Sequence, residues 1–426
     1  MTDDRSEDGL SREMKPTELS QVVARRIIET LGNSGTPPEY GFQYFTEGID
    51  PYLVVIDQEY FHSFIEVGGS AFKMVVGIYG GGKTHFLYCV RELGWKHDFI
   101  SSYIVLSPDR TPFHKLELVY NEIVANLIYS QSPEQLLSGY DRGIQAVIER
   151  WYKDKVEEFS QGKPGDAITQ DLLDYANSIG PYDSTSYKNA LKHAFISLAT
   201  KNDATFELMI QWLKGETPKM AEMKRYGVSE KIDKGMAFKA IRSVVQWVKE
   251  IGYSGLIVLL DEAEQSGSLT SKQKGQLYQN LRELIDECGH ANFQGTMWFY
   301  AVPDVSFLEG RTLIYEALKQ RLSTVFDPEL NPTGVKIMLE GPGVDPRPPN
   351  EILVAIGEKL AKVYEVGYDV KLDPQILGPS LAEIAEAAYS KKLDTGYKRL
   401  FIQTAIRAFN TIKKTGKPVK PADVGL

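Results

Sequence analysis

The sequence predicts an α/β protein in which a mostly parallel sheet carries flanking helices. Short apolar runs that suit buried strands alternate with segments of helical periodicity. A glycine-rich turn joins the first such strand to the first such helix. A long stretch with helical periods only separates the second strand from the third, and three more helical patterns end the chain. We therefore expect a parallel-sheet core, a large helical insertion and a C-terminal helical lid.

Five apolar runs are predicted to be the strands of this sheet: residues 72–78, 103–106, 256–260, 296–302 and 335–339. Helices are predicted over residues 83–93 and around 241–248. Another helix is predicted to begin at Thr111-Pro112, an N-cap and first-turn pair. The chain from about 130 to 250 shows helical periods and loops, with a clear break at Gly162-Lys163-Pro164-Gly165, and is the expected insertion.

Domain boundaries follow from changes in composition along the chain. Residues 1–15 are polar and charged without periodicity, so we expect a disordered tail. Residues 16–70 should be a helical and linker region, where Pro16-Thr17 opens a helix and Gly32 can end it. The remaining parts are a core at 71–340, a linker at 342–349, a lid at 345–415 with helices near 350–365, 379–390 and 396–413, and a tail at 416–426.

Composition excludes several classes of protein. With 42% hydrophobic and 25% charged residues, the 426-residue chain is an ordinary globular sequence, neither disordered, collagenous nor disulfide-stapled. No apolar run reaches about 18 residues, so no membrane span is expected. The polar N-terminus does not resemble a signal or transit peptide. The two cysteines, Cys89 and Cys288, lack metal-site spacing, and the chain suits a reducing cytoplasm.

Charge is distributed unevenly. The chain has 48 basic and 57 acidic residues, a net charge of −9. The segment Lys391–Lys420, however, holds nine basic residues and one acidic residue. DNA could bind there, or to the helical insertion, even though the whole protein is acidic. The alternative is a solvated helix face followed by a frayed tail.

Residues Gly77–Thr84 fit the phosphate-binding pattern G-x-x-x-x-G-K-[ST]. Glycines let backbone N–H groups turn toward phosphates, Lys83 adds a positive charge, and Thr84 offers a hydroxyl to Mg²⁺. The following helix points its positive end at the anion. His85 also suits packing inside the first helical turn. The predicted nucleotide-binding residues are Gly77, Tyr79, Gly80, Gly81, Gly82, Lys83, Thr84 and His85.

Two carboxylates, Asp261 and Glu262, follow the apolar run Leu256–Leu260 directly. In a P-loop protein the Asp at such a strand end holds Mg²⁺, so Thr84 and Asp261 are the predicted metal residues. Glu262 can then act as general base for an attacking water. The pair favours hydrolysis over nucleotide binding alone. The alternative is a strand that merely ends at an acidic turn.

Three more side chains are candidates for this chemistry. Asp304 follows the fourth predicted strand and can orient the water. Arg321 follows a predicted helix and can reach the γ-phosphate of a neighbouring subunit, with Arg311 as a competing candidate. Arg399 opens the last long helix, where a lid arginine would lie. The alternative for Asp304 is a turn residue without a catalytic role. For Arg321 it is a surface ion pair, and for Arg399 it is one more basic residue of the tail.

The segment Tyr79-Gly80-Gly81-Gly82-Lys83-Thr84-His85-Phe86-Leu87 resembles the phosphate loop of the ATP-binding proteins of BREX phage-defence systems, the BrxD group. The flanking segments are similar too, over roughly residues 20–410. They include Thr36-Pro37-Pro38, Phe45-Thr46-Glu47-Gly48, Thr111-Pro112-Phe113-His114-Lys115 and Gly255-Leu256-Ile257-Val258-Leu259-Leu260-Asp261-Glu262-Ala263-Glu264. This resemblance is more specific than a generic phosphate loop, because it includes His85 and the second acidic residue after Asp261-Glu262.

The resemblance implies an AAA+-like ATPase that uses ATP and Mg²⁺ in a bacterial or archaeal antiviral system. It implies a homo-oligomer and other defence proteins as partners, among them a helicase. Replication initiators of similar plan carry a C-terminal winged helix, for which this sequence has no room. DNA contact would then fall to the insertion, the basic segment or a partner.

Two functions compete on this evidence. One is a cycling ATPase that remodels a DNA–protein complex or loads a partner. The other is a slow nucleotide-gated switch or scaffold, for which the insertion and the 11% aromatic content would supply a partner surface. A small-molecule kinase fits the acidic strand end and the lid poorly. The six histidines are scattered, so no metal beyond Mg²⁺ is expected.

Overall fold

The structure is a computed structural model that describes residues 19–131, 135, 139, 141–160, 168–263, 269–304, 313–340, 345–392 and 396–426. The described chain divides into two compact units. The first holds the described residues up to Ile49, together with Tyr79–Gly81 and Asp345–Leu426. The second holds Asp50–Ile78 and the described residues from Gly82 to Val344. The predicted tail at 1–15 and the predicted break at 162–165 lie outside the described residues.

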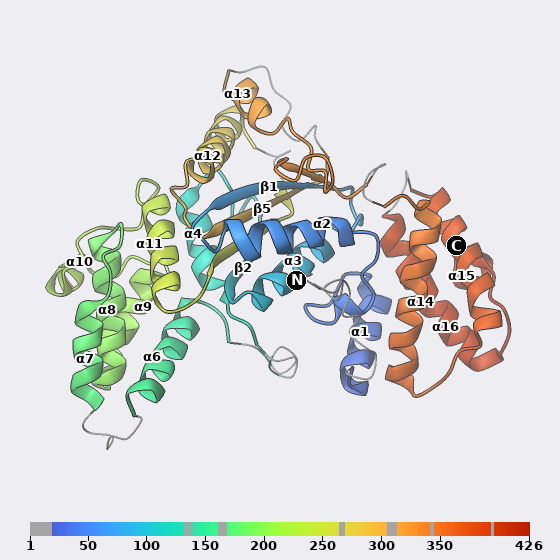
Figure 1. Cartoon of the computed structure of the whole chain (residues 1–426), viewed down its shortest axis with the longest axis horizontal. Helices are drawn as coiled ribbons and strands as arrows, with labels where there is room; N and C mark the ends of the chain where they lie inside the picture. The colour runs from blue at the N-terminus through green and yellow to red at the C-terminus, as the bar shows by residue number, and fades with distance from the viewer. Residues whose placement is uncertain are drawn as a thin grey trace, which may run out of the picture. The chain divides into compact units, whose positions relative to one another are not determined.

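A six-stranded sheet forms the centre of the second unit, as Figure 1 shows. The strand order is β3-β2-β4-β5-β1-β6, and only β3 is antiparallel to its neighbour. The predicted mostly parallel sheet is therefore confirmed, with β3 as an addition that is too short to show a pattern in sequence. The strands are Ser70–Val76 (β1), Phe99–Val105 (β2), Leu127–Ile128 (β3), Gly255–Asp261 (β4), Thr296–Val302 (β5) and Lys336–Met338 (β6).

Strand β5 lies between β1 and β4, although it follows both in sequence. Every residue of β4 and β5 is buried, and apart from Thr296 and Asp261 both strands are apolar or glycine, as expected for strands covered on both faces. The register pairs Val76 with Val302 and Leu260 with Tyr300. Because the three strands are parallel, their carboxyl ends meet at one edge of the sheet, and the residues that follow each strand gather there.

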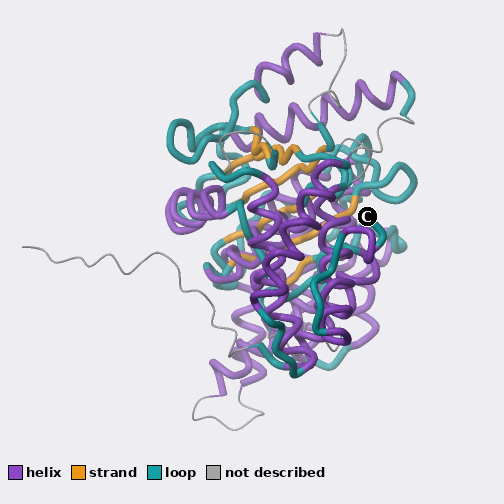
Figure 2. Tube along the Cα trace, turned by 90° about the vertical axis from the view of Figure 1, so that its right-hand side faces the viewer, coloured by secondary structure: helices purple, strands orange, loops and turns teal. Residues whose placement is uncertain are grey.

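In the turned view of Figure 2 the strands are orange and the helices purple. The strands of the sheet alternate along the chain with helices of the second unit. Outside the insertion, these helices are α2 (Asp50–Val55), the π-helix η3 (Ile56–Phe64), α3 (Lys83–Lys96), α4 (Leu116–Ala125), α12 (Ser271–Gly289) and α13 (Leu313–Arg321). The prediction that a helix begins at Thr111-Pro112 is wrong, because α4 begins at Leu116. The Thr111 N–H donates to the Ser107 carbonyl at 3.2 Å, and the Lys115 N–H donates to the Pro112 carbonyl at 2.9 Å. These two turns use the residues that would have formed the first helical turn.

The insertion is helical, as predicted, and packs on the same side of the core as α4 (Figure 1). Aromatic side chains fill its interior: the Trp151 ring lies 4.4 Å from Phe195 and 5.7 Å from Trp247, centroid to centroid. All three are buried, so these aromatic residues stabilise the core of the insertion and are not part of a partner surface. The elements are α6 (Ile144–Ser160), α7 (Ile168–Ser178), α8 (Thr185–Ala199), α9 (Asp203–Leu213), α10 (Met220–Met223), η5 (Lys224–Tyr226) and α11 (Ala237–Glu250).

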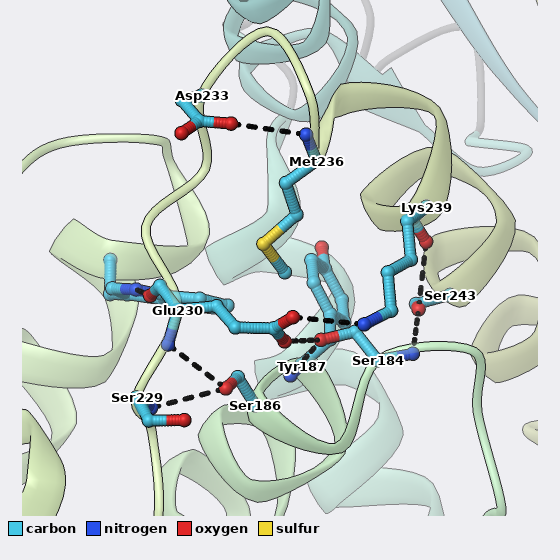
Figure 3. A network of polar contacts seen from close by, with 10 residues as sticks. Ser184, Ser186, Tyr187, Ser229, Glu230, Asp233, Met236, Lys239 and Ser243 are labelled. Carbon is cyan, nitrogen blue, oxygen red and sulfur yellow. Dashed lines mark hydrogen bonds and ion pairs between the residues drawn. The ribbon is translucent and has the colours of Figure 1, made fainter.

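A polar network anchors the loop between η5 and α11 to the helices beside it (Figure 3). The Glu230 carboxylate accepts from Ser184 Oγ at 2.9 Å and from Lys239 Nζ at 2.9 Å. Ser186 Oγ accepts the backbone N–H groups of Ser229 and Glu230. The bond from Lys239 is the largest cause that lowers the pKa of Glu230. The charged carboxylate therefore joins α8 to α11 through the loop.

The first unit is a bundle of α1 (Gln21–Ser34), α14 (Pro349–Tyr368), α15 (Pro374–Ser390) and α16 (Tyr397–Thr415), with the short helices η2 (Phe42–Tyr44) and η8 (Pro421–Val424). Pro16-Thr17, where the first helix was predicted to open, lie outside the described residues, and α1 begins at Gln21. Ser20 caps α1 by accepting from the Val23 N–H, and Gly35 ends it with a φ of 64°. Gly32 does not stop the helix, because it lies inside α1 against Ile406. None of the described helices is long and apolar enough to cross a membrane.

Lys73 is a buried cation in β1, with only 1% of its surface exposed. Its Nζ donates to Tyr60 Oη and to the Gly334 carbonyl, each at 2.6 Å. The ring centroids of Tyr60 and Phe326 lie 4.4 and 4.5 Å from the same nitrogen. No described carboxylate forms an ion pair with it, so burial lowers the pKa of Lys73 to about 7.

We expect Lys73 to make the stability of the fold depend on pH. Its pKa is about 7 in the folded chain and near 10.5 in the unfolded chain. Between these values the unfolded chain binds the extra proton, so the free energy of unfolding should rise with pH by about 1 kcal/mol per unit. Below pH 7 the residue adds no slope.

Lys73→Met should remove this rise, whereas Lys96→Met, at an exposed lysine of α3, should keep it. Urea unfolding of the three proteins from pH 6.5 to 9.5 measures the effect. Equal slopes in the parent and in Lys73→Met would contradict the assignment.

Candidate functional site

The phosphate-loop sequence joins β1 to α3, in the predicted strand–loop–helix order. Gly80 and Gly82 have φ angles of 70° and 103°, in the left-handed region that side chains rarely adopt. At the start of the loop, the Gly77 N–H donates to the Val302 carbonyl of β5 at 3.1 Å. Helix α3 begins at Lys83, so the helix N-terminus faces the loop that precedes it.

The Lys83 side chain turns back into the loop. Its ammonium donates to the Gly77 carbonyl at 2.9 Å and to the Ile78 carbonyl at 3.3 Å, and 7% of the residue is exposed. The loop therefore concentrates a fixed positive charge and a helix N-terminus at one place. This combination attracts phosphate groups.

Asp261 connects three elements of the site. Its Oδ2 accepts from Thr84 Oγ1 at 2.6 Å and from Tyr103 Oη at 2.8 Å. Its Oδ1 accepts from the Glu262 N–H at 2.8 Å, and only 1% of the residue is exposed. The structure thus brings together Thr84 and Asp261, the two predicted metal residues, which are 177 positions apart in sequence.

Tyr103 is a site residue that the sequence analysis missed. It lies on β2, which runs parallel to β4, and is paired with Leu259. Burial, followed by the charge of Asp261, raises the pKa of Tyr103 well above its ordinary value, so its hydroxyl remains a donor. The ring packs against Tyr88, 5.0 Å between centroids. The only sequence signal was a tyrosine at the start of the predicted apolar run 103–106.

Glu262 and Asp304 follow the two neighbouring strands β4 and β5. Glu262 is exposed and has a φ of 56°, a left-handed conformation that costs a non-glycine residue about 1 kcal/mol or more. Backbone strain of this kind gathers at functional sites. Asp304 is exposed two residues beyond β5, at the edge where β1 and β4 also end. The competing candidate Arg311 lies outside the described residues.

Arg321, the predicted finger, is the last residue of α13 and is held within its own chain. Its Nε donates to Asp286 Oδ1 at 2.5 Å and its Nη2 donates to Asp286 Oδ2 at 3.0 Å. Nη1 donates to the Ala317 carbonyl at 2.9 Å. The guanidinium is therefore fully oriented by α12 and α13. A role in a neighbouring subunit would require this bidentate pair to open.

Arg399 lies beside the phosphate loop, and so does Lys398. Arg399 Nη1 donates to Tyr79 Oη at 2.9 Å, with the guanidinium 5.1 Å from the ring centroid. Lys398 Nζ donates to the Gly81 carbonyl at 3.0 Å. A Cβ at Gly80 would come within 2.8 Å of the Gly396 Cα, so only glycine allows this approach. Two cations of α16 thus contact residues of the loop, of which the sequence predicted only Arg399.

The family model for the BREX system ATP-binding protein BrxC/D matches residues 19–417. The chain belongs to the BrxC/D family. The predicted resemblance is therefore confirmed. The family is described as ATP-binding proteins of the BREX phage-defence system. Comparisons with curated proteins and with solved structures find no match.

The donor set of this BrxC/D-family protein fits Mg²⁺ brought by a nucleotide. Thr84 and Asp261 supply hard oxygen donors, and Mg²⁺ is commonly bound by one or two such groups together with phosphate oxygens. Among the described residues, no group of three His, Cys, Asp or Glu side chains could hold a metal ion alone. The site therefore suits a metal that arrives with the phosphates. His85 is half-buried in the first turn of α3.

Tyr103→Phe should weaken the response to Mg²⁺ in this protein. The variant removes a hydrogen bond to a charged carboxylate, worth roughly 1.5–3 kcal/mol, so Asp261 should be less firmly oriented. We expect about a tenfold higher half-saturating Mg²⁺ concentration for ATP binding, with ATP binding in EDTA unchanged. Isothermal titration calorimetry over a Mg²⁺ series measures both.

Tyr182→Phe is the matched control, because it removes a tyrosine–carboxylate bond of 2.5 Å to Glu250 in the insertion. It should leave the Mg²⁺ response unchanged. A similar shift in both variants, or in neither, would show that Tyr103 does not position Asp261 for the metal.

Proposed function

We propose that this chain is an AAA+-type ATPase that binds and hydrolyses ATP–Mg²⁺ to remodel or load a partner on DNA during anti-phage defence. The contact between Thr84 and Asp261 carries the proposal, because it joins a loop hydroxyl to a buried strand-end carboxylate. Glu262 follows immediately, at the edge of the sheet where Asp304 also lies. The strand order, with β5 between β1 and β4, supports the same proposal.

Each residue has a defined part in the proposed reaction. Lys83 neutralises charge on the β- and γ-phosphates, while Thr84 and Asp261 hold the metal with the nucleotide. Glu262 accepts a proton from water as the water oxygen attacks the γ-phosphorus and the bond to ADP breaks. Asp304 orients that water. The backbone of Gly77, Tyr79, Gly80, Gly81 and Gly82 surrounds the phosphates.

The cations of α13 and α16 would couple hydrolysis to assembly. Arg399 and Lys398 contact Tyr79 and Gly81, so nucleotide entering the loop would compete for the same cations. Arg321 would stabilise charge in a neighbouring subunit of a homo-oligomer after leaving Asp286. Partners would include other BREX proteins, among them a helicase.

A slow nucleotide-gated switch or scaffold is the second candidate. The observation in its favour is the bidentate pair between Arg321 and Asp286. An arginine held by its own chain does not stimulate a neighbour, so hydrolysis would remain slow until the pair opens. In that case ATP binding, not turnover, would recruit the partner.

Glu262→Gln should lower ATP turnover by about 100-fold or more while ATP binding persists, because the amide cannot accept the proton from water. Lys83→Ala should abolish ATP binding itself. Phosphate release, with and without double-stranded DNA, and calorimetric ATP binding measure the two effects. Glu283→Gln, at an exposed glutamate of α12, is the control and should match the parent. Parental turnover in Glu262→Gln would refute the catalytic assignment.

Arg321→Ala should lower turnover by about 1,000-fold if the arginine acts across subunits, without loss of ATP binding. Mixing Arg321→Ala with Glu262→Gln should then restore part of the activity, since each variant keeps the group that the other lacks. Asp286→Asn, which frees the guanidinium, should maintain or raise turnover. If the mixture stays inactive, or Arg321→Ala equals the parent, the arginine only joins α13 to α12.

A further inference from the structure

Three helices of the first unit, α1, α14 and α16, pack against one another. Gly35, at the end of α1, lies against Arg399 at the start of α16, so the two helices run in opposite directions. Gly367, near the end of α14, lies against the start of α1, because a Cβ at this position would come within 3.0 Å of the backbone nitrogen of Arg25. The beginning of α1 and the ends of α14 and α16 are therefore neighbours.

Tyr368, the last residue of α14, contacts side chains from all three helices at this end of the bundle. The Arg25 guanidinium lies 5.2 Å from its ring centroid and the Lys413 ammonium lies 4.5 Å from it. The ring also stacks on buried Tyr364 at 4.5 Å, and Tyr364 Oη donates to Asn410 Oδ1 at 2.7 Å. Packing thus fixes Tyr368, and cations from two other helices gather on it.

Within the basic segment Lys391–Lys420, the structure leaves the cations at this end of the bundle as the candidates for binding DNA. Arg399 and Lys398 contact the phosphate loop, and Arg407 donates to the Val424 carbonyl at 3.1 Å. The remaining lysines after α16 begins are exposed and lie in its last turn and beyond, namely Lys413, Lys414, Lys417 and Lys420. No acidic residue lies between Asp394 and Asp423 in the sequence.

Acidic side chains near this end only partly offset the cations. Glu29 pairs with Arg25 at 3.6 Å, but both side chains are more than 60% exposed, so the pair is weak. Glu365 is engaged by Lys371 at 2.9 Å and by the Leu372 N–H at 2.8 Å. Asp369, which follows Tyr368, is exposed. The end retains an excess of positive charge that can meet a polyanion.

We infer that Arg25, Tyr368, Lys413, Lys414 and Lys417 form a surface that binds the phosphate backbone of DNA. The inference deepens the proposed function, because it names the surface through which an ATPase acting on DNA would hold it. The surface presents exposed cations, and contacts of this kind to phosphate carry no sequence information, so binding should be independent of sequence. The structural alternative is that the lysines only stabilise the negative C-terminus of α16.

Salt dependence distinguishes these two roles. Four cations that each neutralise one phosphate give a slope of about −3.6 for log affinity against log salt concentration on duplex DNA. Replacing Lys413 and Lys414 with Ala should reduce the slope by about 2 and weaken binding at least tenfold at 50 mM salt. Lysines that served the helix alone would change stability but not this slope.

The experiment measures fluorescence anisotropy of a labelled 25-base-pair duplex, and of the matching single strand, with the full chain between 50 and 200 mM salt. The matched control is Lys231→Ala with Lys234→Ala, two exposed lysines of the insertion that give the same change of charge. We expect the control to bind as the parent does. Lys413→Arg with Lys414→Arg should retain binding. If the alanine pair proves unstable, Lys417→Ala should lower the slope by about 1.

Several results would overturn the inference. Absence of binding by the parent would do so, as would equal losses in both alanine pairs or a loss confined to the insertion pair. Equal affinity for polyglutamate or for phosphatidylserine vesicles would show a general anion surface instead. Lys83→Ala should bind DNA as the parent does, since no nucleotide is needed. Failure of the ATPase assignment would therefore leave this result unchanged, and failure here would leave the ATPase assignment unchanged.

Discussion

One buried carboxylate, Asp261, constrains the geometry of the whole site. A buried charge is costly unless hydrogen-bond donors surround it. Asp261 accepts three hydrogen bonds: one from Thr84 of α3, one from Tyr103 of β2 and one from the backbone N–H of the next residue, Glu262. Thr84 and Tyr103 can reach it only if the loop before α3 starts that helix beside β4 and if β2 keeps its parallel register. The elements of the site are therefore coupled through a single side chain.

The order of the strands explains why this coupling is possible. Strand β5 separates β1 from β4, so the loop after β1 and the acidic pair after β4 face each other across the end of β5. The Gly77 N–H bond to Val302 ties the start of the loop to that middle strand. Chemistry that needs a phosphate, a metal and a water at one point can use this edge of the sheet.

Three of the arginines and lysines outside the loop are each oriented by a specific neighbouring residue. Arg321 is oriented by Asp286, Arg399 by Tyr79, and Lys413 lies on Tyr368. The sequence alone could not distinguish these cations from unpaired surface charges, because the charge of a residue does not reveal which side chain it contacts. Residues Tyr79–Gly81 belong to the same compact unit as α16, which relates the tip of the phosphate loop to the cations of that helix.

The sequence by itself determined the parallel sheet, the strand–loop–helix order around Gly77–Thr84 and the family. These depend on local patterns: apolar runs of strand length, glycines at left-handed positions, and a Lys-Thr pair opening a helix. Tertiary structure alone decided the contact of Tyr103 with Asp261, the pairing of Arg321, and the place where basic residues collect. The start of α4 at Leu116 is a local outcome that periodicity also missed, because hydrogen bonds from Thr111 to Ser107 and from Lys115 to Pro112 form turns there. Such outcomes depend on residues far apart in the chain, or on competing local bonds, and periodicity contains no record of either.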